Sequence, residues 1–243
     1  MIKKIYLNYH NLGYSQQIGI NKVHPRIFKN HITLLDSIVL NMKGTLDVSI
    51  TFDDGYESVY KYAKKILEAS NITDKKIFVI TNYIGKLNAW DFSFFINTYK
   101  HLSESEILDM SSSNWEIGSH GTSHRSLLSM SFSEAKDEIV ESKKRLEDIT
   151  GNETYSIAPP FSHINQKIYD YCGESGYREI YVQKMMDIKE SKGLKINYRN
   201  NIYSIDNNRN IIAKINQSRG ERLKENFISS FNNLTVFFSK YFH

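Results

Sequence analysis

The segment Val48–Tyr56 constrains the fold of this chain more than any other stretch. It reads Val-Ser-Ile-Thr-Phe-Asp-Asp-Gly-Tyr, so an alternating apolar run stops at two adjacent carboxylates and a glycine. The alternation predicts a buried strand, and Gly55 allows the backbone to turn at its end without the steric cost of a Cβ. Because neighbouring side chains of a strand point to opposite faces, Asp53 and Asp54 are expected to have different tasks. One carboxylate could bind a cation while the other accepts a proton. Alternatively, Asp54 caps a helix that begins near Tyr56.

Composition places the chain among folded globular proteins. Its 243 residues are enough for one substantial core, and 40% of them are hydrophobic. A net charge of +4 is too weak, and the lysines are too dispersed, to indicate a nucleic-acid partner. Cys172 is the only cysteine, which excludes an intrachain disulfide and a thiolate metal cluster. Residues 1–10 lack the apolar stretch of a signal peptide, so we expect a cytoplasmic location unless a leader has been removed; no apolar run is long enough to cross a bilayer.

Strands and helices are predicted to alternate along the chain. The predicted strands cover 4–9, 48–52, 75–81, 115–120, 155–157, 178–182 and 202–205, and the predicted helices cover 25–39, 56–70, 103–110, 133–149, 165–172 and a tail from about 211. Such alternation predicts a parallel α/β sheet or barrel. No linker divides the chain, so we expect a single domain over residues 1–243 with a helical extension at 211–243. We interpret an apolar stripe in this extension as core-facing rather than as a membrane or partner surface; it comprises Leu223, Phe227, Phe231, Leu234 and Phe238.

Candidate functional residues follow the predicted strands. His10, the pair Asp53 and Asp54, His120 and Phe161 each come just after a strand. In α/β barrels, the loops that follow the strands build the active site. These residues are therefore candidates for one shared site.

His120 and His124 form a second motif, His-Gly-Thr-Ser-His. On a helical turn, their spacing would bring both imidazoles to one face, close enough to share a cation. Such a pair also arises by chance and is then structural. Combined with an aspartate from another strand end, it gives two histidines and one carboxylate with an open position for water. That ligand type suits Zn²⁺, and also Fe²⁺, Co²⁺ or Mn²⁺.

Four features of the chain occur together in one enzyme family. They are Thr51–Tyr56, the His120/His124 pair preceded by Glu-Ile-Gly-Ser, the following Leu127-Leu128, and Pro160-Phe161. Together they resemble the polysaccharide deacetylases, the NodB-homology group or carbohydrate esterase family 4, and the resemblance is strongest over residues 5–185. It implies a metal-dependent N-deacetylase on a distorted (β/α) barrel, with Asp54, His120 and His124 as metal ligands and Asp53 as the catalytic base. The metal would be zinc first, with cobalt, iron, manganese or nickel as alternatives.

The resemblance also implies how these groups share the work. The metal would acidify water and polarise the acetamide carbonyl, and Asp53 would take the proton of that water. The backbone N–H of Phe161, beside Pro160, would help to stabilise the oxyanion. A histidine would then protonate the leaving amine.

The histidine that protonates the amine is expected near the start of the chain. Many family members carry it in a Leu-x-x-His motif close to the C-terminus, whereas here Leu7-Asn8-Tyr9-His10 fits that motif. This order resembles the circularly permuted branch that includes poly-N-acetylglucosamine deacetylases, because moving one strand of a closed barrel from last to first preserves its place in space. His10 is therefore the candidate general acid, with His163 as its rival and a structural role as the alternative. The remaining internal histidines, His24, His31 and His101, lack supporting context and are expected at the surface.

The proline loop departs from the family pattern. Many members carry Arg-Pro-Pro-Tyr-Gly, whose arginine orients the base, whereas this chain reads Ala-Pro-Pro-Phe-Ser over residues 158–162. Arg199 is a candidate for supplying that cation from a later strand. Gly121 also stands where serine or threonine is usual.

Three functions are compatible with these residues. The ordered motifs favour N-deacetylation of an amino sugar in a polysaccharide, an oligosaccharide or a linked sugar intermediate. The altered proline loop motivates a second function, that of a carbohydrate-binding pseudoenzyme with the same fold and metal. The third is hydrolysis of a formyl group or a cyclic amide by the same ligand set. In the first two cases the partner is a carbohydrate.

Overall fold

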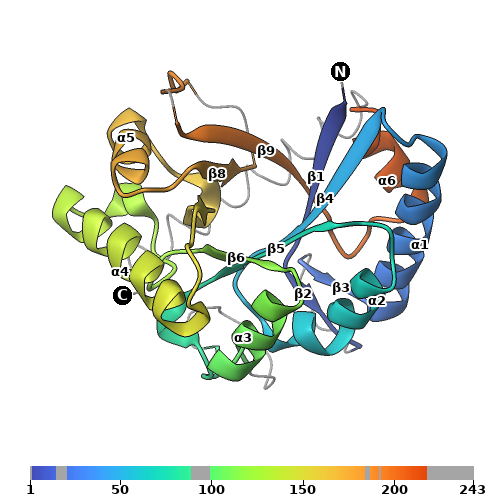
Figure 1. The fold of residues 1–243 in the computed structure, drawn as a ribbon, viewed down its shortest axis with the longest axis horizontal. Helices are drawn as coiled ribbons and strands as arrows, with labels where there is room; N and C mark the ends of the chain where they lie inside the picture. The colour runs from blue at the N-terminus through green and yellow to red at the C-terminus, as the bar shows by residue number, and fades with distance from the viewer. Residues whose placement is uncertain (1, 15–20, 89–98, 184–186, 192, 218–243) are drawn as a thin grey trace.

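Seven parallel strands close into a barrel in the computed structural model, which describes residues 2–14, 21–88, 99–183, 187–191 and 193–217 (Figure 1). The strands follow one another around the barrel in chain order, and the last pairs with the first. They are β1 (Lys3–Tyr9), β4 (Leu46–Phe52), β5 (Asp74–Val79), β6 (Glu116–Ser119), β7 (Ser156–Ile157), β8 (Glu179–Val182) and β9 (Lys195–Asn201). Two short strands, β2 (Asn11–Leu12) and β3 (Lys22–Val23), pair only with each other. The predicted α/β barrel is thus confirmed.

Helices cover the outside of the barrel. In Figure 1, α1 (Pro25–Asn41), α2 (Lys64–Glu68) and α6 (Asn208–Ile215) lie on one side, and α4 (Phe132–Thr150) and α5 (Gln166–Glu174) lie on the other. The remaining helix is α3 (Glu104–Ser112), a π-helical turn (Val59–Ala63) leads into α2, and 3₁₀ turns cover Thr81–Tyr83, Leu127–Ser129 and Pro160–Ser162. Among the described helices, none is long and apolar enough to cross a membrane.

The strands are buried on both faces. Their outward side chains, such as Leu7, Ile50 and Ile77, are fully buried in a core that they form with α1, α2 and α3. A second core lies around Ile139 of α4 and Ile168 of α5. The opposite faces of the strands contribute a smaller cluster made of Tyr6, Phe78, Ala158 and Tyr181. This double burial is typical of parallel barrels with an outer layer of helices.

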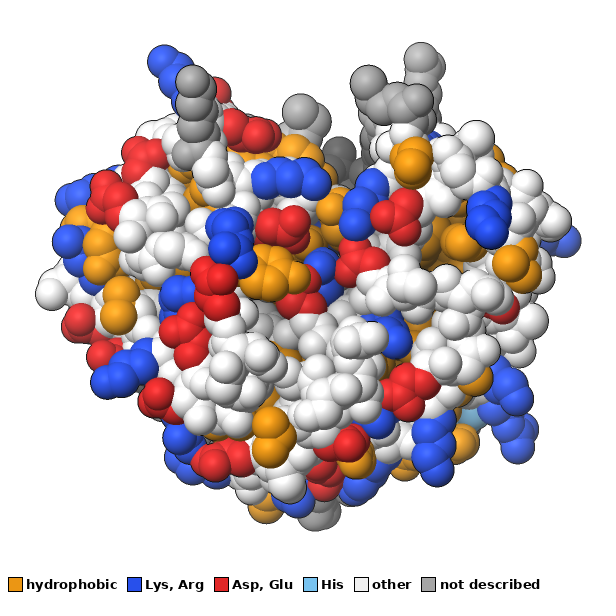
Figure 2. Space-filling model, viewed as in Figure 1, with side chains coloured by type: hydrophobic (Ala, Val, Ile, Leu, Met, Phe, Trp, Pro, Cys, Tyr) orange, Lys and Arg blue, Asp and Glu red, His pale blue; other side chains and the backbone are white. Residues whose placement is uncertain are grey.

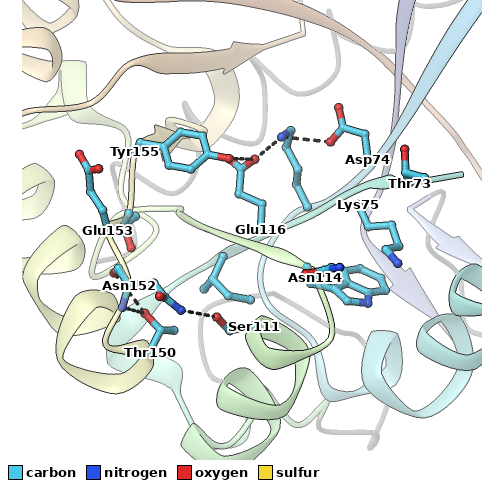
Figure 3. A pocket seen from close by; sticks show the side chains of 14 residues that line it. Thr73, Asp74, Lys75, Ser111, Asn114, Glu116, Thr150, Asn152, Glu153 and Tyr155 are labelled. Atoms are coloured by element: carbon cyan, nitrogen blue, oxygen red, sulfur yellow. Dashed lines mark hydrogen bonds and ion pairs between the residues drawn. The ribbon is translucent and has the colours of Figure 1, made fainter.

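A charged network lies where the barrel strands begin. Lys76 Nζ pairs with Asp74 Oδ1 at 3.0 Å and with Glu116, whose carboxylate accepts a hydrogen bond from Tyr155 OH at 2.7 Å (Figure 3). Lys4 Nζ contacts the second oxygen of Asp74 at 2.7 Å. A pocket of about 400 Å³ opens at this network. Barrels place their chemistry at the opposite mouth, so this end is expected to serve stability.

The surface carries both signs of charge. Figure 2 shows acidic and basic side chains interspersed over the face that is also seen in Figure 1. The described residues of this face form no continuous basic patch of the kind that binds nucleic acid.

The structure corrects two element predictions. The last strand is β9 and not residues 202–205, because the inward side chains of β9 are polar and hide its alternation. The helix predicted to begin at Ser133 begins after Ser131, which forms a capping box with Glu134. The apolar stripe predicted between residues 223 and 238 lies outside the described residues.

Candidate active site

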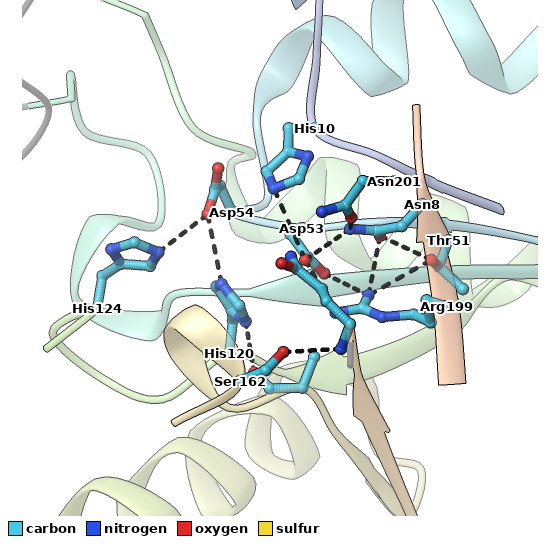
Figure 4. A network of polar contacts seen from close by, with 12 residues as sticks. Asn8, His10, Thr51, Asp53, Asp54, His120, His124, Ser162, Arg199 and Asn201 are labelled. Atoms are coloured by element: carbon cyan, nitrogen blue, oxygen red, sulfur yellow. Dashed lines mark hydrogen bonds and ion pairs between the residues drawn. The ribbon is translucent and has the colours of Figure 1, made fainter. Parts of the chain in front are cut away.

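Three buried side chains converge where the strands of the barrel end (Figure 4). Asp54 comes just after β4, and His120 and His124 come from the segment after β6. Asp54 Oδ1 lies 3.4 Å from His120 Nε2 and 3.3 Å from His124 Nε2. The three ligand atoms all lie within 4.8 Å of one another, close enough to hold a metal ion.

The chemistry of these three donors fits a cation. His120 Nδ1 lies 2.5 Å from the carbonyl oxygen of Ala158, which can only accept, so Nδ1 carries the proton. Nε2 is then the nitrogen that would bind an ion next to Asp54, and a backbone acceptor on the other ring nitrogen is typical of histidines that bind metals. Burial raises the pKa of Asp54, but its bonds to the two imidazoles outweigh that effect and hold the pKa well below its usual range. The ionised carboxylate and the imidazole nitrogens suit a divalent ion such as Zn²⁺.

The histidine pair lies on a loop and not on the helical turn predicted for it. Gly121 has φ +76° and His124 has φ +61°, which are left-handed values that an α-helix does not contain. The loop still brings the two rings together, with centroids 5.1 Å apart. The left-handed backbone also explains why glycine is suited to position 121.

Asp53 lies beside the metal ligands and has separate partners. Arg199 of β9 donates to both of its oxygens, from Nη1 to Oδ1 at 2.7 Å and from Nη2 to Oδ2 at 3.0 Å. Both side chains are almost fully buried, with 2% and 1% of their surface exposed. Burial raises the pKa of Asp53, but the Arg199 guanidinium, assisted by His120 and His10, more than reverses this and lowers it. The structure therefore brings Arg199 to the position that the sequence left without an arginine.

Asn8 is a contact of Asp53 that the sequence analysis missed. Its Nδ2 donates to Asp53 Oδ2 at 2.9 Å, and its Oδ1 accepts from Thr51 Oγ1 at 2.7 Å and from Arg199 Nη1 at 2.8 Å (Figure 4). Asn201 Oδ1 accepts from the same Nδ2 at 3.0 Å. The alternation of β1 could have identified Asn8, because it places position 8 on the inner face of the barrel, where a polar side chain needs polar partners.

His10 also approaches Asp53. Its Nε2 lies 3.9 Å from Asp53 Oδ2, and 13% of its side chain is exposed. Nδ1 of His10 is buried and has no hydrogen-bond partner among the described residues. His163, the rival candidate, instead places its ring 6.0 Å from that of Phe161 and its Nδ1 3.4 Å from Ser126 Oγ.

Two histidines expected at the surface are buried, which corrects that prediction. His101 is 1% exposed, and its Nδ1 donates to the backbone oxygen of Asp54 at 2.9 Å. It thereby supports a residue whose backbone has the left-handed φ of +71°. His31 is fully buried and contacts Tyr9 OH at 3.2 Å. His24 caps α1.

The proline loop borders the histidine pair. Phe161 has φ +60°, and its ring centroid lies 5.0 Å from that of His124. Ser162 has φ +54°, and its Oγ accepts from the backbone N–H of Gln183 at 2.9 Å. Pro160 is buried at the start of the turn. Two consecutive left-handed residues fix the direction of the loop next to the candidate metal ligands.

Comparison with known proteins identifies a family. The family model described as polysaccharide deacetylase matches residues 43–180, more than half of the chain. A protein of Bacillus subtilis (strain 168), provisionally named polysaccharide deacetylase YxkH, is 27% identical over 131 residues. That alignment covers 54% of this chain and 42% of the relative, so the chain matches less than half of the relative's length.

Solved structures share the fold. Streptococcus pyogenes deacetylase PplD, in complex with acetate, superimposes with a TM-score of 0.70 at 17% identity, over 88% of this chain and 98% of that one. BC0361, a polysaccharide deacetylase from Bacillus cereus, gives a TM-score of 0.68 at 20% identity, over 87% and 68% of the two chains. At these identities the likeness concerns the barrel itself.

Proposed function

The chain belongs to the polysaccharide deacetylase family, and we propose that it is a metal-dependent hydrolase that removes N-acetyl groups from an amino sugar. The sugar would be part of a polysaccharide, an oligosaccharide or a linked sugar intermediate. The observation that carries the proposal is the different surroundings of two adjacent carboxylates. Asp54 faces two imidazoles, whereas Asp53 faces Arg199, Asn8 and His10.

Each carboxylate suits one task. A divalent ion held by Asp54, His120 and His124, zinc first and cobalt, iron, manganese or nickel as alternatives, would polarise the acyl carbonyl and acidify water. Asp53 is not aimed at the two imidazoles, and its lowered pKa keeps it ionised and able to accept a proton from water. Arg199 and Asn8 fix the position of its oxygens.

The remaining groups suit the later steps of amide hydrolysis. His10 lies at the edge of the site and is partly exposed, so it can protonate the amine as the C–N bond breaks. Phe161 has a left-handed backbone beside His124, and its N–H is the proposed oxyanion donor. His163 is directed to Ser126 and Phe161, which favours His10 as the acid.

We also propose that the chain belongs to the circularly permuted branch of the family. The strand that leads to His10, β1, is first in the sequence, and it lies between β4 and the last strand, β9. Tyr6 is opposite Arg199 and Asn8 is opposite Asn201 in this pairing. This pairing is compatible with the proposed permutation, because a strand moved from last to first would keep its place between the same two neighbours.

The test is release of acetate from N-acetylhexosamine oligomers and N-acetylated glycolipids. We expect release that a chelator abolishes, that added Zn²⁺ or Co²⁺ restores, and that Asp53→Asn lowers by about 100-fold or more while metal binding persists. Asp137→Asn, an exposed change of the same kind on α4, serves as the control. Metal-loaded protein that releases no acetate from any of these substrates would overturn the proposal.

The same experiment separates the alternatives. A pseudoenzyme would bind the oligomers without hydrolysing them. That hypothesis was motivated by the arginine missing from the proline loop, but Arg199 contacts Asp53 directly. Formylated sugars and cyclic amides, assayed beside the acetylated ones, reveal whether the acyl group is other than acetyl.

A further inference from the structure

One buried carboxylate lies behind the candidate metal ligands and contacts none of them. Glu138 extends from α4 and is 8% exposed. Its Oε2 accepts from the backbone N–H groups of Thr122 at 2.7 Å and Ser123 at 3.0 Å. Its Oε1 accepts from Ser123 Oγ. One carboxylate thus binds three donors of the loop between His120 and His124, and hydrogen bonds of this charge-assisted kind are among the strong ones.

The turn that follows β5 binds the carbonyl groups of the same loop. Thr81 N–H donates to the carbonyl of Gly121 at 3.2 Å, and Asn82 N–H donates to the carbonyl of Thr122 at 3.0 Å. The carbonyls of Gly121 and Thr122 therefore point to the turn after β5. The N–H groups of Thr122 and Ser123 point to Glu138. Both hydrogen-bonding directions of this short loop are satisfied by elements that have no other part in the site.

Gly121 and Glu138 fit each other closely. A Cβ built at Gly121 would lie 3.0 Å from Glu138 Oε2, closer than most carbon–oxygen contacts of that kind. A side chain at position 121 would therefore press on the carboxylate, in addition to the strain of φ +76°. Glycine at position 121 thus leaves the space that the carboxylate of Glu138 needs.

We propose that Glu138 is a positioning residue that holds the His120–His124 loop in the conformation that binds the metal. His124 has φ +61°, a conformation that L-residues adopt only when the surroundings impose it. Anchoring the two amides just before His124 fixes the direction in which its ring leaves the loop. The inference rests on the proposed function, because it assumes that Asp54, His120 and His124 bind an ion.

The first test compares metal affinity in Glu138→Ala and wild-type protein. Zn²⁺ affinity is measured by competition with a chromophoric chelator, and the melting temperature of the metal-free protein is measured in parallel. We expect the alanine variant to bind Zn²⁺ about 10- to 100-fold more weakly, the range typical for loss of a group that orients metal ligands. We expect its fold to persist, because alanine is the best helix former and α4 keeps its other contacts.

Two further variants make the result decisive. Glu138→Gln keeps the length and one acceptor oxygen, so we expect an affinity between those of wild type and alanine; this variant carries the test if alanine prevents folding. Glu141→Ala removes an exposed carboxylate from the same helix and is expected to leave the affinity unchanged. A folded Glu138→Ala protein with wild-type Zn²⁺ affinity overturns the role of Glu138 alone, whereas wild-type protein that binds neither Zn²⁺ nor any of the alternative divalent ions overturns the proposed function as well.

Discussion

At the scale of single residues, the most informative contacts are those that Asp53 makes with side chains of two strands that are far apart in the sequence. Arg199 of β9 and Asn8 of β1 reach the same carboxylate from adjacent strands, because β9 closes the barrel on β1. Arg199 supplies charge, and Asn8 supplies a fixed donor whose oxygen is itself held by Thr51. Two side chains, Arg199 and Asn8, therefore fix the orientation of the Asp53 carboxylate.

Asn8→Ala tests the contribution of Asn8 to the orientation of Asp53. The variant keeps the Arg199–Asp53 pair but loses the bond from Nδ2 to Asp53 Oδ2, so the base can rotate within the site. We expect kcat for acetate release to fall by about 10- to 100-fold, with little change in KM or Zn²⁺ affinity, because the side chain of Asn8 bonds to Asp53 and its neighbours and not to the metal ligands.

Asn200→Ala is the matched control, since Asn200 is half-buried on β9 and donates to the backbone of Tyr6 rather than to Asp53. Equal kcat values in wild type and Asn8→Ala would contradict the positioning role.

His10→Ala tests the general acid through the leaving group. An amine must be protonated as it leaves, whereas an activated phenolate departs without a proton. We expect hydrolysis of the acetamide to fall by about 100-fold or more and hydrolysis of an aryl acetate by less than about threefold. Rates are compared at saturating Zn²⁺ in the same preparation. Equal losses on both substrates would assign His10 to structure and return His163 to consideration.

The sequence predicts the candidate metal ligands better than the residues that hold the site in place. Asp54, His120 and His124 stand out because metal ligands come from few residue types, and because they follow strands that meet at one end of a barrel. Asn8, His101 and Glu138 carry no such signal. Each acts on a backbone or side chain that comes near it only after folding, and asparagine, histidine and glutamate are ordinary surface residues when read along the chain.

At the scale of elements, the turn after β7 combines strain with an anchor. Phe161 and Ser162 both have positive φ, and the hydroxyl of Ser162 ties the turn to the backbone just after β8. Serine at a position with left-handed φ is tolerated here because its Oγ makes a bond that glycine could not make. The departure from the family's glycine therefore has a local physical reason.

A pair of variants at this turn separates strain from anchoring. Both Ser162→Ala and Ser162→Gly lose the acceptor for Gln183 N–H, but only alanine keeps a Cβ at φ +54°. We expect the glycine variant to be more stable than the alanine variant by about 1 kcal/mol, after allowance for the greater freedom of glycine in the unfolded chain. The free energy of unfolding is measured in urea with chelator present. Equal stabilities would show that the turn relaxes around either residue.

Element boundaries show which sequence signals were sufficient. Strands β1, β4 and β5 were predictable because their outward faces are apolar and regularly spaced. β9 escaped prediction because Asn197, Arg199 and Asn201 fill its inner face, and this polar face is the one that serves the site. The start of α4 was available as a capping box, Ser-x-x-Glu, but the neighbouring Ser133 competes with Ser131 for the same role.

At the scale of the whole molecule, the two ends of the barrel carry different charge arrangements. The end with the candidate site holds carboxylates beside imidazoles, whereas the opposite mouth holds Lys4 and Lys76 against Asp74 and Glu116. Burial raises the pKa of Asp74, but Lys76 and Lys4 outweigh it and hold that pKa below its ordinary value of 3.8. The mouth thereby links the starts of β1, β5 and β6 by ion pairs.

Asp74→Asn tests this link through the pH dependence of stability. A carboxylate whose pKa is lower in the folded than in the unfolded state contributes stability that is complete above the unfolded pKa and disappears as the pH falls through the folded pKa. We expect the variant to be less stable than wild type by about 2 kcal/mol at pH 7. The difference should shrink as the pH falls below about 4, where Asp74 is protonated first in the unfolded chain.

The measurement is urea unfolding of both proteins between pH 7 and pH 2.5, with chelator present so that metal release at low pH does not enter the comparison. Asp137→Asn removes the same charge from an exposed site on α4 and is expected to follow the wild-type curve. A constant difference between wild type and Asp74→Asn across this range would mean that the ionised form of Asp74 is not what stabilises the mouth. In that case Asp74 would stabilise the mouth through contacts that do not depend on its charge, and the pairing of Lys76 with Glu116 would remain as the ion pair that links β5 to β6.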